Sequence, residues 1–169
     1  VTPEKWNPVK DQFPKAVSEV VQKTMAEIMG LSPGYCGGRG GSMHLRYAEA
    51  GILGTNAIVG GGIPLATGAA YAEQYSKSGN VVVCFFGDGA INQGVFHESC
   101  NLAGIWNLPV IYFVENNLYG VGTHADISCA VKDLSIRADS YGMDGRIIDG
   151  NDVTAIYETV KNVAAGIRK

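Results

Sequence analysis

The stretch VVVCFFGDGAINQGVFHESCNLAGIWNLPVIYFVENN, residues 81–117, decides the fold of this chain. It contains two runs of apolar, β-branched and aromatic residues, at 81–86 and 109–114, and no charged residue interrupts either run. Such runs are typical of strands covered on both faces, as in a parallel sheet. The residues between them, about 91–106, have apolar side chains at helical spacing. One helix is therefore predicted to join two parallel strands.

That helix is predicted to bury a single apolar face. The face consists of Ile91, Val95, Leu102 and Trp106. The same periodicity predicts helices over 15–29, 63–75, 134–141 and 152–165, a short third strand at 145–149 and a loop at 120–134. Strands that alternate with helices predict an α/β fold, a parallel sheet flanked by helices, in one domain over 1–169. Residues 1–14 contain three of the six prolines and are expected to be an extended arm.

The composition excludes several classes of protein. The chain has 169 residues, 46% of them hydrophobic and 17% charged, with a net charge of −3. No block of Lys and Arg indicates a nucleic acid or an anionic membrane as partner. No segment approaches the roughly 20 apolar residues of a membrane span. The four cysteines have no metal-ligand spacing and are expected to be small buried hydrophobes in a reducing compartment.

Glycine is abundant and clustered. Of the 23 glycines, five lie in residues 34–41 and three in 60–62, and isolated pairs occur at 87/89 and 120/122. Such clusters indicate positive φ angles or a close approach of the backbone to a bound group.

Two polar side chains follow the ends of the two predicted strands. Asp88 comes directly after 81–86, and Asn117 follows 109–114. Ligands of open parallel sheets bind beyond the carboxyl ends of the strands, so both residues are expected at one edge. A carboxylate and an amide oxygen there, with backbone carbonyls nearby, form a hard oxygen site suited to Mg²⁺.

The glycines on either side of Asp88 favour an anion at the same place. Their backbone N–H groups can approach a ligand closely, and a helix that begins near Ala90 would direct its positive end toward it. A diphosphate held by Mg²⁺ is therefore the expected ligand. Gly-Asp-Gly and Asn-Asn also occur in ordinary turns, but turns alone do not explain why each follows a buried strand with one helix between them.

Three segments resemble one known family. GDGAINQGVFHESCNLAGIWNLPVIYFVENNLYGVGT (87–123) resembles the thiamine-diphosphate motif in the alpha subunits of 2-oxo acid and acetoin dehydrogenase E1 components. GGSMHL (40–45) and NAIVGGGIPLATGAAYA (56–72) resemble two further signatures of these subunits, in the same order. The resemblance extends from about Thr24 to the end of the sequence and implies a thiamine-diphosphate-binding fold, of which this chain is expected to be a truncated core.

The resemblance implies a role for seven residues. It implies that the side chains of Asp88 and Asn117 and the backbone carbonyl of Tyr119 bind Mg²⁺. It implies that the cofactor is contacted by the following residues: Ala57, Val59, Asp88, Gly89, Ala90 and Asn117. Within this set, the N–H groups of Gly89 and Ala90 contact the diphosphate, whereas Ala57 and Val59 line the rest of the cofactor.

The resemblance also implies an activity and partners. The reaction is oxidative decarboxylation of a 2-oxo acid such as pyruvate, or cleavage of acetoin, with transfer of the acyl unit to a lipoyl group. An E1 beta subunit supplies the catalytic glutamate in an α₂β₂ heterotetramer, so no catalytic residue is assigned here. The lipoyl acyltransferase E2 is the second partner. Neither nucleic acid nor membrane is expected, and the implied location is cytoplasmic, with the mitochondrial matrix left open.

Two departures from the family keep an alternative open. The Tyr-Arg pair that holds the diphosphate upstream and the catalytic histidine downstream have no counterpart in this sequence. The chain could instead be a non-catalytic scaffold that keeps the fold. A nicotinamide-binding domain is disfavoured because no GxGxxG follows a predicted strand. Four residues have open roles, near the site or purely structural: His44, His97, Glu115 and His124.

Overall fold

The computed structural model of this protein describes Gln12 and residues 14–168. The extended arm predicted for residues 1–14 lies almost entirely outside these residues. The chain divides into two compact units, residues 1–57 and 58–169, and each is described by itself. The single domain expected from the sequence stays a prediction.

The first unit is a helix followed by a glycine-rich loop. Helix α1 spans Lys15–Ile28, as predicted, and Gly30 follows it with a φ of +72°. Glu27 is the one buried residue of α1, and its carboxylate accepts hydrogen bonds from three backbone N–H groups of the loop. The group that these glycines approach is therefore the chain's own carboxylate. A short 3₁₀ helix, η1 (Ala48–Ala50), lies farther along.

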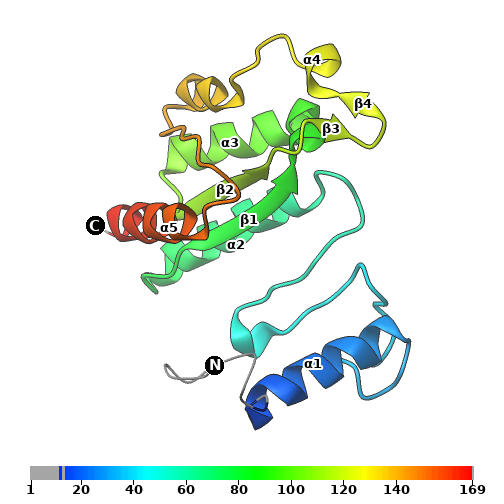
Figure 1. Cartoon of the computed structure of the whole chain (residues 1–169). Helices are drawn as coiled ribbons and strands as arrows, with labels where there is room; N and C mark the ends of the chain where they lie inside the picture. The colour runs from blue at the N-terminus through cyan, green and yellow to red at the C-terminus, as the bar shows by residue number, and fades with distance from the viewer. Residues whose placement is uncertain (1–11, 13, 169) are drawn as a thin grey trace. The chain divides into compact units, whose positions relative to one another are not determined.

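The second unit contains the predicted pair of parallel strands. Strand β1 (Val82–Gly87) pairs with β2 (Val110–Glu115), in a register that runs from Val82 opposite Val110 to Gly87 opposite Glu115. Helices α2 (Gly62–Ser76) and α3 (Gly94–Trp106) lie on one side of the strands and α5 (Val153–Ile167) on the other (Figure 1). This arrangement confirms the α/β fold with a parallel sheet flanked by helices.

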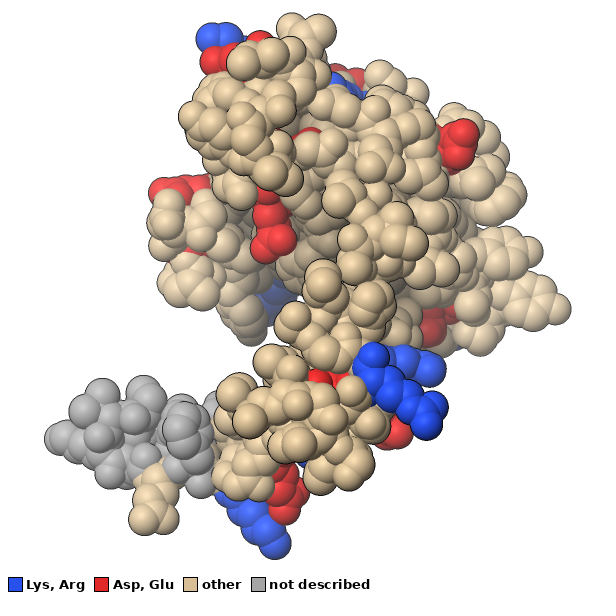
Figure 2. Space-filling model, turned by 90° about the vertical axis from the view of Figure 1, so that its right-hand side faces the viewer, with Lys and Arg blue, Asp and Glu red and all other residues tan. Residues whose placement is uncertain are grey.

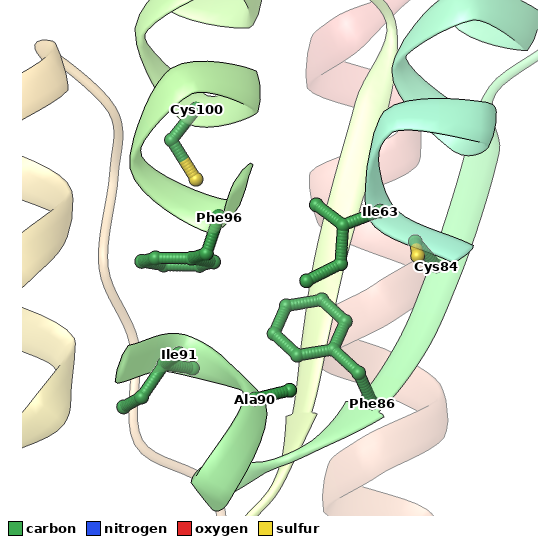
Figure 3. Close-up of a cluster of buried hydrophobic side chains, with 7 residues drawn as sticks. All are labelled: Ile63, Cys84, Phe86, Ala90, Ile91, Phe96 and Cys100. Atoms are coloured by element: carbon green, nitrogen blue, oxygen red, sulfur yellow. The ribbon is translucent and has the colours of Figure 1, made fainter. Parts of the chain in front are cut away.

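The core of the second unit lies between β1 and the two helices α2 and α3. Figure 3 shows its seven buried side chains, which are Ile63, Cys84, Phe86, Ala90, Ile91, Phe96 and Cys100. A hydrogen bond of 2.7 Å between the hydroxyl groups of Thr67 and Tyr112 joins α2 to β2 beside them. Burial raises the pKa of the Cys100 thiol to about 12, and Cys84 is buried as well, so both are buried hydrophobes, as expected. Cys36 and Cys129 are only partly buried, so the expectation is wrong for these two.

The prediction for the buried face of the helix between the strands is only partly correct. Ile91 is 1% exposed, as expected, but it lies before α3, in residues 88–92. The side chains that α3 buries are Phe96, Ser99, Cys100 and Ala103. Leu102 is 38% exposed and Trp106 45% exposed. Three of the four buried residues are small, which lets α3 approach its neighbours closely. The prediction relied on the large apolar side chains of Leu102 and Trp106, which lie beside these small residues and are partly exposed.

Strand β1 is well covered on one face only among the described residues, whereas β2 is at least partly buried on both faces. Cys84 and Phe86 of β1 are buried, whereas Val83 and Phe85 between them are 36% and 63% exposed. The prediction that both faces are covered is therefore wrong for β1. Residues on the open face are as apolar as those on the buried face, so the sequence does not distinguish the two.

The segment after β2 differs from its prediction in detail. The expected loop at 120–134 contains a small hairpin, β3 (Tyr119–Gly120) with β4 (Thr123–His124), and one helical turn, α4 (Ala125–Ser128). The helix predicted at 134–141 is the 3₁₀ helix η3 (Leu134–Tyr141). The strand predicted at 145–149 is wrong, because these residues pair with no described strand and Ile147 is 75% exposed.

The surface has few charges. Most of the face in Figure 2 is uncharged, and acidic and basic side chains occur in small separate groups. Within residues 14–168, every helix is too short or too polar to cross a membrane.

Candidate functional site

Asp88 lies at the carboxyl end of β1, where it begins the 3₁₀ helix η2 (Asp88–Asn92). The preceding residue, Gly87, pairs with Glu115 at the end of β2, so the two strands end together. Asp88 is only 3% exposed. Its carboxylate takes part in none of the hydrogen bonds or ion pairs found among the described residues. Among the described residues, no buried side-chain oxygen is without a hydrogen-bond partner, so the unpaired carboxylate oxygens of Asp88 reach the surface and are open to a ligand.

Asn117 lies on the exposed loop that leaves β2. Its side-chain oxygen accepts a hydrogen bond of 2.9 Å from the backbone N–H of Tyr119. The oxygen of Asn116 accepts one of 3.1 Å from Leu118 in the same way. An amide oxygen with one hydrogen bond keeps a second lone pair, which can bind a cation. The loop thus fixes the direction of the Asn117 oxygen without using up its capacity as a ligand.

Helix η2 and the segment after β2 approach each other at a pair of glycines, Gly89 and Gly120. A Cβ atom on Gly89 would lie 3.3 Å from the Cα of Gly120, a contact tighter than most that real Cβ atoms make. The backbone of η2 therefore lies directly against β3, which contains Tyr119. This approach brings residues 88–90 and 117–120 to one edge of the sheet, as the sequence predicts, although 29 positions separate Asp88 from Asn117.

The helix expected to begin near Ala90 begins later. Residues 88–92 form a separate five-residue 3₁₀ helix, and Gln93 interrupts the chain in an extended conformation before α3 starts at Gly94. The positive end of the long helix is therefore not at Ala90, and that part of the prediction is wrong. The N–H groups of Gly89 and Ala90 lie in the first turn of η2, and their contact with a diphosphate stays a prediction.

Val59 and Ala57 lie in different units. Val59 is 64% exposed, in the turn that leads into α2. The next residue, Gly60, has a φ of +77°, and a Cβ atom there would lie 3.0 Å from the side-chain oxygen of Gln93. The turn of Val59 is thus adjacent to Gln93, the residue that follows η2. Ala57 is the exposed last residue of the first unit, and its contact with a cofactor stays a prediction.

One histidine with an open role lies beside the candidate metal ligands. The ring of His124 packs edge-on against that of Tyr119, with 4.8 Å between centroids. Its Nδ1 atom accepts a hydrogen bond of 3.1 Å from the N–H of Asp126 and so caps α4. His97 contacts the hydroxyl group of Tyr141, which places it between α3 and η3.

Two residues near the site were missed by the sequence analysis. Arg137 and Asn92 form a hydrogen-bonded network at the end of η2. Nothing in the sequence connects them, because 45 positions separate the two residues.

Comparison with known proteins agrees with the fold. A family model described as "Dehydrogenase E1 component" matches residues 13–169. The chain belongs to the dehydrogenase E1 component family.

Curated members of this family are similar to the chain over most of its length. The alpha subunit of acetoin:2,6-dichlorophenolindophenol oxidoreductase from Bacillus subtilis (strain 168) is 50% identical over 137 residues, which cover 81% of this chain and 41% of the relative. The pyruvate dehydrogenase E1 component subunit alpha of Rickettsia typhi is 41% identical over 145 residues, which cover 86% of this chain and 44% of the relative. The chain thus spans less than half the length of these E1 subunits.

Proposed function

We propose that this chain binds thiamine diphosphate and Mg²⁺ as an E1 alpha-type subunit. The observation that supports this most strongly is Asp88, a residue only 3% exposed whose carboxylate oxygens have no hydrogen-bond partner among the described residues and remain accessible. A divalent cation at the edge of the sheet would compensate its charge. The Asn117 side-chain oxygen and the Tyr119 carbonyl complete the proposed set of protein ligands.

In this proposal the chain binds the cofactor and fixes its orientation. Asp88 contributes the negative charge of the site, and Asn117 contributes a neutral oxygen whose direction is fixed by the N–H of Tyr119. Gly89 and Ala90 present backbone N–H groups to the diphosphate. When bound, thiamine diphosphate supplies the carbon nucleophile that this chemistry requires.

We propose oxidative decarboxylation of pyruvate, or cleavage of acetoin, with acyl transfer to a lipoyl group. The names of the two relatives, an acetoin oxidoreductase and a pyruvate dehydrogenase, support these two substrates equally. Both relatives are named as alpha subunits, which supports an E1 beta subunit as partner. An α₂β₂ assembly, a lipoyl acyltransferase and a cytoplasmic location belong to the same proposal.

Calorimetry with thiamine diphosphate and Mg²⁺, on the chain mixed with an E1 beta chain, tests the proposal. Wild type is expected to bind, and Asp88→Ala is expected to lose about 100-fold or more in affinity, because it removes the charged ligand. Glu115→Gln is the matched control. Glu115 is an exposed carboxylate at the end of the neighbouring strand, so its loss should leave binding unchanged. No binding by wild type, or equal binding by Asp88→Ala, would favour a scaffold that keeps the fold without the cofactor.

A further inference from the structure

The short helix η2 carries three of the proposed cofactor-binding residues, but five residues of 3₁₀ helix have little stability of their own. It follows β1 directly at Asp88, and the extended residue Gln93 separates it from α3, so α3 does not continue into it. Ala90 and Ile91 anchor one side of η2 in the core beside Phe86 and Phe96 (Figure 3). Asn92, at the end of η2, is exposed, so contacts from elsewhere in the chain are needed to fix this end.

Arg137 supplies such a contact. From η3, its Nη1 atom donates a hydrogen bond of 2.9 Å to the carbonyl of Ile91. Its Nη2 atom donates one of 2.9 Å to the side-chain oxygen of Asn92. The two branches of one guanidinium group therefore hold two consecutive residues. The last carbonyls of a helix have no partner inside it, and a cation is favourable there.

Asn92 extends the contact to α4. Its amide nitrogen donates to the carbonyl of Ser128 at 3.2 Å, while its oxygen accepts from Arg137. Each polar end of the Asn92 side chain thus has a partner from the segment that follows β3. No ion pair among the described residues competes for the guanidinium of Arg137.

The segment 119–137 consequently touches η2 at both of its ends. Gly120 lies against Gly89 near the start of η2, and Arg137 binds the residues at its end. One proposed metal ligand, Tyr119, belongs to this segment, and another, Asp88, belongs to η2. A contact that fixes η2 against this segment also fixes the separation of the two ligands.

We propose that Arg137 is a positioning residue, which holds η2 in the geometry that the cation and diphosphate site requires. This inference rests on the proposed function for its ligand, but the hold on η2 itself does not depend on it. Removing Arg137 leaves Asp88 in place and frees the end of its helix. Residues that orient metal ligands typically change affinity by about 10- to 100-fold when mutated.

The experiment compares Arg137→Ala and Arg137→Lys with wild type. Arg146→Ala is the control, since Arg146 is an arginine that is half-exposed and paired with Asp144. The first measurement is backbone hydrogen exchange without ligand. In Arg137→Ala, the amides of 89–92 are expected to exchange at least about 10-fold faster, while those of α5 keep the wild-type rate. Arg137→Lys keeps a single donor group, so the exchange rate of these amides is expected to lie between those of wild type and Arg137→Ala.

The second measurement is affinity for thiamine diphosphate with Mg²⁺. Arg137→Ala is expected to weaken it about 10-fold or more, and Arg146→Ala to leave it unchanged. Unchanged exchange in 89–92, or faster exchange spread equally through α5, would overturn the proposal. So would wild-type affinity in Arg137→Ala, whereas Asp88→Ala would still report on the proposed function. If Arg137→Ala does not fold, Arg137→Lys decides by the same two measurements.

Discussion

Two buried carboxylates, Glu27 and Asp88, lie beside glycines in this chain, and their surroundings differ. Glu27 is 0% exposed and accepts hydrogen bonds from the N–H groups of Cys36, Gly38 and Gly40 at 2.6–2.9 Å. Asp88 is 3% exposed and has no such partner among the described residues. Glycine-rich segments therefore serve two purposes here. One wraps an internal anion, and the other leaves an anion available to a ligand.

The largest effect is expected from Glu27→Ala. It leaves three partly buried N–H groups without their acceptor, and a donor that loses its partner away from water is costly. The three amides are expected to lose their protection against hydrogen exchange altogether, while the amides of β1 and α3 keep theirs. Protection that survives in Glu27→Ala would show that the glycine-rich loop holds its shape without the carboxylate.

The next effect separates two glycines of the same loop. Gly37 and Gly38 have φ angles of +67° and +73°, so alanine at either position costs about 1–2 kcal/mol. A Cβ atom on Gly38 would also lie 2.6 Å from the carbonyl oxygen of Gly30, whereas one on Gly37 meets nothing within 4 Å. Gly38→Ala is expected to destabilise the first unit by about 1–3 kcal/mol more than Gly37→Ala. Exchange of the α1 amides measures the difference, and equal effects would contradict the close packing of the loop.

A smaller effect is expected from acid. Burial alone would raise the pKa of Glu27, but hydrogen bonds from the loop, including those of Gly38 and Gly40, outweigh it and hold this pKa below its usual value of 4.5. A carboxyl group with a lowered pKa contributes its full stability above the unfolded value and loses it as the pH falls through the folded one. Protection of the Gly38 and Gly40 amides is expected to persist at pH 5 and to fall below about pH 4.5. In Glu27→Gln this protection should be weaker and should not change in that window.

The smallest effect concerns the glycines beside Asp88. A Cβ atom on Gly89 would press on Gly120, whereas one on Gly87 meets nothing within 4 Å. Gly89→Ala is expected to change the free energy of unfolding by less than about 1 kcal/mol and to weaken cofactor affinity by roughly 10-fold, because it shifts η2 from β3. Gly87→Ala is the control for both measurements. Equal affinities of the two variants would mean that the approach of Gly89 to Gly120 does not shape the site.

The sequence predicts the parts of this fold that depend on local patterns. The apolar runs locate β1 and β2 within a residue of their observed bounds, and they place Asp88 and Asn117 at the strand ends. The spacing of apolar residues does not show which side of β1 is covered, because Phe85 is as apolar as Phe86 but is 63% exposed. That outcome depends on where the helices pack, which no local pattern contains.

Long-range polar contacts are harder to predict. Glu27 is one of several charged residues on a helix, and only the fold shows that the loop closes over it. Arg137 likewise reaches η2 across 45 positions without any motif that joins them. The break at Gln93 was missed because Ile91 and Val95, on either side of it, keep the spacing of one continuous helix.

Thermal unfolding of wild type and Asp88→Asn, with and without Mg²⁺ and thiamine diphosphate, tests the central claim most directly. Asparagine has nearly the same shape as aspartate but no charge, so without ligand the variant is expected to be at least as stable as wild type. A ligand at about 100 times its Kd should stabilise wild type by about 2.7 kcal/mol and the variant by much less. The account would be contradicted if Asp88→Asn were less stable without ligand and gained as much from the ligand as wild type does.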